Sequence, residues 1–76
     1  MPKLPVVSGD ETVRALEKAG FVFRRQASGH RILRHPDTKV TVPVPIHGSK
    51  DLKPGTLRSI IRDAGLTVEE FIQLLK

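Results

Sequence analysis

A histidine beside a tight turn, with arginines on both sides, is the feature of this sequence with the clearest chemistry. The segment is Arg24-Arg25-Gln26-Ala27-Ser28-Gly29-His30-Arg31-Ile32-Leu33-Arg34-His35. Ser28 and Gly29 tolerate a tight reversal, so the flanking residues predict a β-hairpin with His30 at the first position of the returning strand. An imidazole with a reference pKa of about 6.5 can take or give a proton near neutral pH. Most histidines near hairpin turns, however, are solvated surface residues.

Cleavage of RNA without a metal ion requires little more than such a set of side chains. The attacking group is the 2′-hydroxyl of the substrate, so the protein supplies a base for its proton and cations that stabilise the phosphorane. His30 is the candidate catalytic base or acid. The candidate RNA contacts are Arg25, Arg31, Arg34, Lys50 and Lys53. These residue types permit the chemistry without demonstrating it.

Other kinds of chemistry have less support in the sequence. There is no cysteine, which removes disulfides, a thiol nucleophile and cysteine-ligated zinc. His30 and His35 are five positions apart on one predicted strand and should project from opposite faces, so we expect no metal site. No serine stands in a triad-like context. We expect no cofactor.

The charge of the chain is concentrated in its middle. The formal net charge is +5, and residues 24–58 carry eight basic side chains against two acidic ones, together with all three histidines. Segregation of this kind is typical of a surface that binds a polyanion, most often nucleic acid. A basic surface that is merely solvated is the alternative.

The length of 76 residues predicts one domain, residues 1–76, near the lower limit for folding on a hydrophobic core alone. No apolar run approaches the roughly 20 residues needed to span a bilayer. We therefore expect no membrane association and a cytoplasmic location.

The elements that must position these residues can be placed from local signals. A capping box at Ser8-Gly9-Asp10-Glu11 begins a helix that ends at Gly20. Strands are predicted at 21–26, 30–35 and 39–44, a second helix from Pro54 to a stop at Gly65, and a short third helix after a capping box at 67–70.

This order predicts an α+β fold: a three-stranded antiparallel sheet with helices against one face, in the α-β-β-β-α order of double-stranded-RNA-binding domains. Pro43 indicates that the third strand is an edge. Phe21 and Phe23 are predicted to lie in the core. Because Ile32 and Leu33 are both apolar, the sheet face that carries His30 stays open.

From about Ser8 to Leu75, the chain resembles the HicA toxin family, also called YcfA-like mRNA interferases. The resemblance is carried by Phe21-Val22-Phe23-Arg24-Arg25, Ser28-Gly29-His30, Arg34-His35-Pro36-Asp37 and, most specifically, the segment from Val40-Thr41-Val42-Pro43 through His47-Gly48-Ser49-Lys50-Asp51-Leu52-Lys53-Pro54-Gly55-Thr56-Leu57-Arg58-Ser59-Ile60. Where Gly-Ser is more usual in the family, this chain has Ser28-Gly29.

The resemblance implies the toxin of a type II toxin–antitoxin system with a double-stranded-RNA-binding-like fold. Such toxins cleave mRNA without a metal ion, and a HicB antitoxin binds the toxin and blocks it, so a hetero-oligomer is expected. The family's catalytic histidine corresponds to His30, while His47 and Lys50 match its polar loop, which makes His47 an auxiliary candidate. His35 is expected to be a surface or turn residue. A non-catalytic module that binds double-stranded RNA through the same basic surface is the alternative, and a purely structural interaction protein would leave the charge segregation unexplained.

Overall fold

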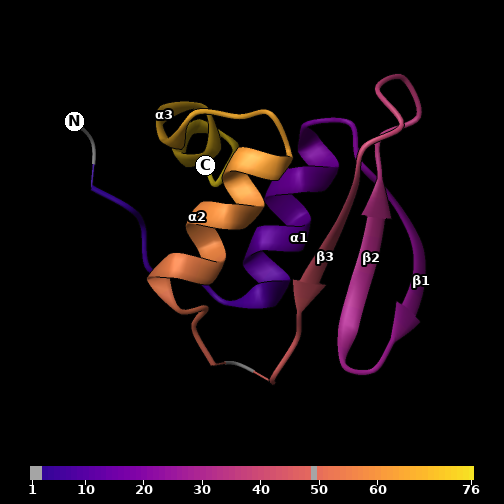
Figure 1. The fold of residues 1–76 in the computed structure, drawn as a ribbon. Helices are drawn as coiled ribbons and strands as arrows, with labels where there is room; N and C mark the ends of the chain where they lie inside the picture. Colours follow the sequence, from indigo (N-terminus) through magenta and orange to yellow (C-terminus); the bar gives the residue numbers. More distant parts are fainter. Residues whose placement is uncertain (1–2, 49) are drawn as a thin grey trace.

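A computed structural model describes residues 3–48 and 50–76 (Figure 1). The elements follow the order α1 (Gly9–Lys18), β1 (Val22–Ala27), β2 (His30–Arg34), β3 (Thr41–Pro45), α2 (Pro54–Asp63) and α3 (Val68–Leu74). The strands form an antiparallel sheet in the order β1-β2-β3. The predicted α+β fold and the edge position of the third strand are confirmed.

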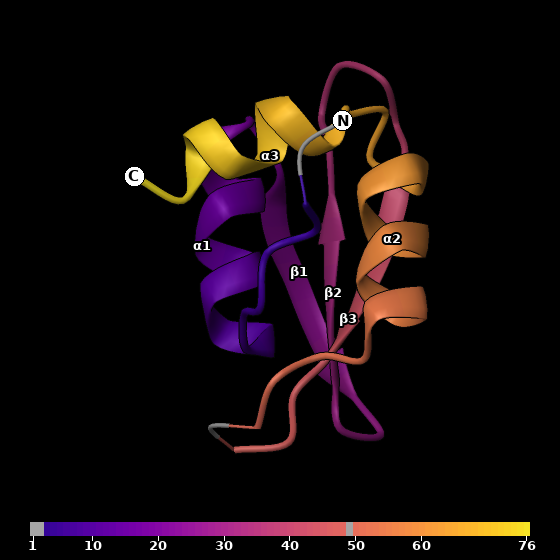
Figure 2. The ribbon, with the colours of Figure 1, turned by 90° about the vertical axis from the view of Figure 1, so that its left-hand side faces the viewer.

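The molecule has two layers, with the three helices on one face of the sheet. Figure 2 shows α1 and α2 in front of the strands, one toward each side of the sheet, with α3 crossing one end. The opposite face of the sheet carries no helix among the described elements. One sheet face is therefore covered and the other is open.

Helix α1 begins and ends where local chemistry predicts. The Ser8 hydroxyl accepts from the Glu11 backbone N–H at 3.2 Å, and the Glu11 carboxylate accepts from the Ser8 N–H at 3.0 Å. Gly20 follows the helix with φ +104°, and a Cβ there would lie 2.8 Å from Nε2 of His35. Both the backbone conformation and the space therefore require glycine at this position.

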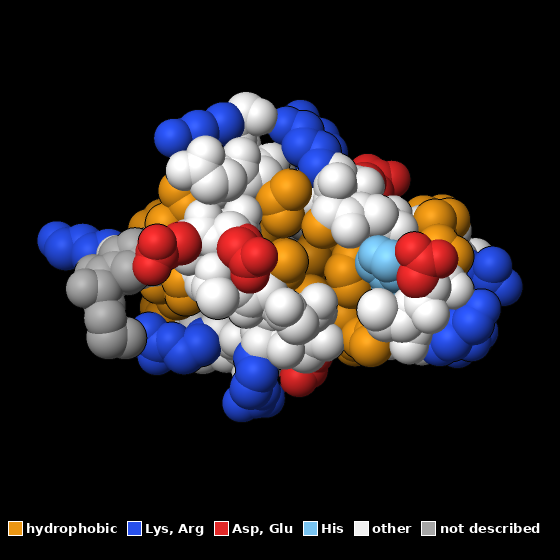
Figure 3. All heavy atoms as spheres, turned by 90° about the horizontal axis from the view of Figure 1, so that it is seen from above, with side chains coloured by type: hydrophobic (Ala, Val, Ile, Leu, Met, Phe, Trp, Pro, Cys, Tyr) orange, Lys and Arg blue, Asp and Glu red, His pale blue; other side chains and the backbone are white. Residues whose placement is uncertain are grey.

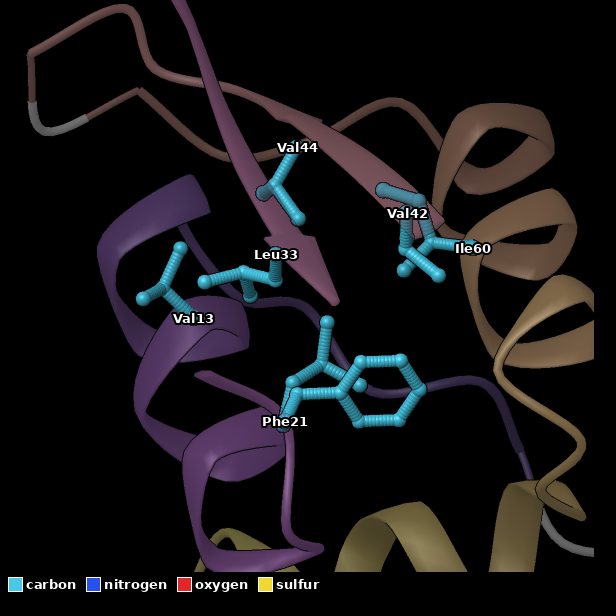
Figure 4. Close-up of a cluster of buried hydrophobic side chains, with 7 residues drawn as sticks. Val13, Phe21, Leu33, Val42, Val44 and Ile60 are labelled. Carbon is cyan, nitrogen blue, oxygen red and sulfur yellow. The ribbon is translucent and has the colours of Figure 1, made fainter. Parts of the chain in front are cut away.

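Two hydrophobic clusters make up the core. The first lies between the sheet and the helices (Figure 4) and consists of Val13, Leu16, Phe21, Leu33, Val42, Val44 and Ile60. The second joins the N-terminal segment to the three helices through Val7, Ala15, Leu57, Ile61 and Phe71. Leu52 and Leu66 pack against both clusters, so the two are continuous.

The prediction that both phenylalanines of residues 21–23 lie in the core is wrong for one of them. Phe21 is 4% exposed, but Phe23 is 46% exposed. Phe23 pairs with Leu33 and so faces the helix layer, but β1 is an edge strand with an irregular register between Phe23 and Arg25. At this edge the helices leave the ring half uncovered.

The third strand begins two residues later than the predicted range of 39–44. Lys39 has φ +65° and its N–H donates to the His35 carbonyl at 2.9 Å, while the His35 N–H donates to the Val40 carbonyl at 2.9 Å. Lys39 therefore closes the hairpin connection and does not start the strand.

Of the described helices, none has both the length and the hydrophobicity needed to cross a bilayer.

Candidate active site

The turn before His30 has the geometry that best suits a two-residue hairpin. Ser28 has φ +50° and Gly29 has φ +76°, and positive values at both central residues are typical of a type I′ turn. His30 pairs with Ala27 across the turn and with Pro45 on the other side. The histidine backbone is thus held in the central strand, directly beside the turn.

The ring of His30 is oriented by the turn itself. Its Nδ1 lies 3.1 Å from the backbone carbonyl oxygen of Ser28. A carbonyl oxygen can only accept, so in this contact Nδ1 carries the proton and donates it. In the neutral ring Nε2 then keeps its lone pair. The half-buried His30 side chain therefore presents Nε2, which in the neutral ring can accept a proton.

The structure answers which sheet face His30 shares. Leu33 is fully buried in the helix-side cluster, and alternation along β2 puts His30, Ile32 and Arg34 on the opposite, open face. Arg25 pairs with Ile32 and so lies on the same face. The open face thus combines the imidazole with two of the predicted RNA-contacting arginines.

Arg31 lies on the other side of the sheet. It pairs with Val44, which belongs to the buried cluster, and its guanidinium lies 3.6 Å from the Asp10 carboxylate. The same carboxylate oxygen, Oδ1, is buried and makes no hydrogen bond among the described residues. Arg31 therefore neutralises a partly desolvated acid at the start of α1, a partner that the sequence analysis missed. The only sign of this ion pair in the sequence was that Asp10 lies in the first turn of a helix. The helix dipole favours an acidic residue at that place whether or not it has an arginine partner.

The remaining predicted site residues gather in the connection between β3 and α2. His47, Lys50 and Lys53 line a hollow of about 490 Å³ together with Pro45, Asp51, Leu52 and Thr56. Pro45 is the strand partner of His30, and the Ile46 N–H donates to the Gly29 carbonyl at 2.8 Å. Figure 2 shows this connection and the β1–β2 turn at the same end of the molecule. The hollow therefore adjoins the histidine turn.

The N-terminal segment supports that connection. The Leu52 N–H donates to the Val7 carbonyl at 2.8 Å, and Ser8 forms an isolated bridge with Asp51. Gly9 lies so close to β3 that a Cβ would overlap the Pro45 carbonyl oxygen. The start of α1, the end of β3 and the approach to α2 are thus packed against one another beside the site.

A family model described as the HicA toxin of bacterial toxin–antitoxin matches residues 9–66. The matched range includes every candidate site residue. The chain belongs to the HicA toxin family. No curated protein matches it in a sequence comparison.

His35 of this HicA toxin is a structural residue of the β2–β3 connection. Its Nδ1 accepts from the backbone N–H groups of Asp37 and Thr38, at 3.2 and 3.4 Å. The ring also meets Phe21 edge-on, with centroids 5.2 Å apart and planes at 85°. With Nδ1 occupied as an acceptor, the ring holds the turn together, which agrees with the expected turn position.

Two further basic residues extend the open face of the HicA toxin beyond the predicted set. Arg24 and Lys39 line a hollow with Arg34, Val22 and Pro36. Their charge was the only signal in the sequence. The end of the molecule that carries α3 and the β2–β3 connection shows acidic and basic side chains around hydrophobic ones (Figure 3). Within residues 3–48 and 50–76, no three His, Asp or Glu side chains are grouped as metal ligands.

Proposed function

We propose that this HicA toxin is a metal-independent endoribonuclease that cleaves mRNA, inhibits translation and growth, and is neutralised in the cytoplasm by a HicB-like antitoxin in a hetero-oligomer. The observation that carries the proposal is the 3.1 Å contact between Nδ1 of His30 and the Ser28 carbonyl. This contact leaves Nε2 available as a base on a sheet face that also carries Arg25 and Arg34.

In the proposed reaction, Nε2 of His30 takes the proton of a ribose 2′-hydroxyl. The resulting alkoxide attacks the adjacent phosphorus, the bond to the 5′ oxygen of the next nucleotide breaks, and that oxygen takes a proton from the imidazolium or from water. The products are a 2′,3′-cyclic phosphate and a 5′-hydroxyl. A single positioned base of this kind contributes about 10²–10⁴ in rate.

The cations beside His30 are proposed to hold the RNA backbone. Arg25 and Arg34 lie on the open face on one side of the histidine, while Lys50 and Lys53 line the hollow beyond Pro45 on the other. RNA crossing the open face would meet cations before and after the scissile bond, and guanidinium groups suit phosphate oxygens. Because Arg31 faces the helix layer, we expect its contribution to come through its charge and not through direct contact.

The first test compares RNA cleavage by the wild-type toxin, His30→Ala and His47→Ala, each in the presence of a chelator. His30→Ala should lose about 10²–10⁴ in cleavage rate while keeping its fold and its RNA affinity. His47→Ala should lose much less. RNA with a 2′-deoxy sugar at the cleaved position should resist the wild-type toxin, because the nucleophile is missing.

If His30→Ala cleaves RNA as fast as the wild type, His30 is a surface histidine and the assignment of the reaction to His30 is wrong; if neither cleaves RNA, the nuclease assignment is wrong. Binding without cleavage by either protein would point to a module that recognises double-stranded RNA. Cleavage that stops on chelation would contradict the metal-independent reaction.

A matched pair of arginines tests the path of the RNA. Arg34→Ala should weaken RNA binding at all sequences. The slope of log affinity against log salt should become less steep by the amount that corresponds to roughly one lost phosphate contact. Arg62→Ala is the control, because Arg62 is exposed on α2 next to Asp63 and away from the sheet. Equal losses for the two variants, measured by titration at several salt concentrations, would mean that the open face has no special part in binding.

A further inference from the structure

The outer edge of β1 has the features of an unoccupied docking site. In the described sheet β1 pairs only with β2, so its outer backbone groups have no strand partner. Exposed strand edges of this kind can accept another strand through main-chain hydrogen bonds. The irregular register between Phe23 and Arg25 disfavours indiscriminate pairing.

Hydrophobic side chains are exposed on both faces of this edge. Val22 is 49% exposed and Phe23 is 46% exposed; among the described residues Val6 is the other large hydrophobic side chain left this open. Phe23 borders a hollow of about 330 Å³ whose other walls are Val13, Glu17, Gln26 and Arg31. This space could receive one apolar side chain from a strand laid along β1.

The charge along this edge selects the occupant. β1 carries two arginines, Arg24 and Arg25, and no acidic residue. A second copy of the chain, paired antiparallel through β1, would bring Arg24 and Arg25 against the same residues of its partner, and like charges opposite one another destabilise strand pairing. A strand with acidic residues would instead find complementary charge.

We propose that the edge of β1 is the docking site for an acidic β-strand of the antitoxin, which adds to the sheet and places an apolar side chain beside Phe23. The inference rests on the antitoxin partner included in the proposed function. Such a strand would lie next to the arginines of the open face, so docking and coverage of the RNA path would coincide.

The test measures backbone amide exchange by NMR in the His30→Ala toxin, free and in complex with its cognate antitoxin. Ala27 and His30 flank a two-residue turn, so the ladder alternation points the Gln26 N–H outward. The Gln26 amide should exchange quickly in the free toxin and be protected by at least about tenfold in the complex. An unchanged exchange rate would overturn the proposal.

Substitution gives an independent readout. Phe23→Ser should raise the Kd for the antitoxin by about tenfold or more, as expected for an aromatic residue central to an interface, while RNA cleavage by the otherwise wild-type toxin stays unchanged. Val6→Ser is the matched control, because Val6 is 78% exposed and lies outside the sheet, and its Kd should not change.

Equal Kd values for Phe23→Ser and the wild type would overturn the docking site. Self-association of the toxin that Phe23→Ser abolishes would assign the edge to a second copy instead. These measurements report binding, so a toxin that proves inactive on RNA but shows protected β1 amides would disprove the nuclease assignment and retain this one.

Discussion

The two histidines on and beside β2 differ in which atoms hold the ring. Nδ1 of His30 donates to the Ser28 carbonyl, while Nδ1 of His35 accepts from two backbone N–H groups. The first arrangement leaves Nε2 of His30 available as a base on the open face. The second makes His35 part of the β2–β3 connection. Residue type alone does not separate these roles, but the hydrogen-bonding partner does.

His35→Ala tests this division. The variant loses two backbone-to-imidazole hydrogen bonds and the edge-on contact with Phe21, so it should be less stable by about 1–2 kcal/mol. For a domain of this size, such a loss lowers Tm by roughly 4–8 °C per kcal/mol. Thermal melts followed by circular dichroism measure the stability. Below the transition, the variant should cleave RNA at the wild-type rate; a loss of cleavage without a loss of stability would give His35 a part in the reaction.

The candidate site could be predicted from the sequence only in part, because the side of a strand that faces the core depends on residues far away in the chain. Ile32 and Leu33 are both apolar, so alternation within β2 does not decide which of these two side chains faces the core. Packing of Leu33 with Val42 and Val44 in the buried cluster decides it in favour of Leu33. The same choice turns Arg31 toward Asp10, which separates it from its neighbour His30.

At the scale of the elements, the helix ends were the most predictable features. The capping boxes at Ser8 and Thr67 are both present, because each depends only on residues within one helical turn. The edge strand was harder. Its register shift near Arg24 and the half-exposed Phe23 depend on how far the helix layer extends, which no local pattern records.

The capping box of α1 predicts an acid-dependent part of the stability. Hydrogen bonds from the Ser8 backbone N–H and, secondarily, the Ser8 hydroxyl hold the pKa of Glu11 below its ordinary value of 4.5. A lowered pKa in the folded state means that the carboxylate stabilises the fold above the unfolded-state pKa, and that this contribution is lost as the pH falls through the folded-state pKa.

Glu11→Gln should therefore be less stable than the wild type near neutral pH, with a difference that shrinks as the pH falls below 4.5. Urea unfolding at a series of pH values measures this difference. Glu69→Gln is the control, since Glu69 lies in the first turn of α3 but is not the residue that forms its capping box. A gap that stays constant into acid would mean that the Glu11 charge does not stabilise α1.

At the scale of the whole molecule, stability depends on two small clusters that share Leu52 and Leu66. Phe71 of α3 is fully buried in the second cluster with Val7, Leu57 and Ile61. That cluster ties the N-terminal segment to α2 and α3, and the same segment supports the connection carrying Lys50 and Lys53. The same N-terminal segment therefore joins the second cluster to the connection that forms part of the candidate RNA path.

Phe71→Ala should destabilise the protein by about 3–5 kcal/mol, because it removes a large buried side chain and leaves a cavity. This is a large fraction of the 5–15 kcal/mol typical of a folded domain, so cleavage should be lost together with the fold. Phe23→Ala is the matched comparison: the half-exposed ring should cost less than about 1 kcal/mol. Urea unfolding of both variants checks the contrast, and similar midpoints would mean that the second cluster contributes little.

The second cluster brings together Val7 and Phe71, which are synthesised at different times. During translation, Val7, α1 and the whole sheet are synthesised before α3. The second cluster closes only when Phe71 emerges, and until then the connection that carries Lys50 and Lys53 lacks its full support. An mRNA-cleaving toxin with this arrangement would complete its RNA path only after its message has been translated as far as α3.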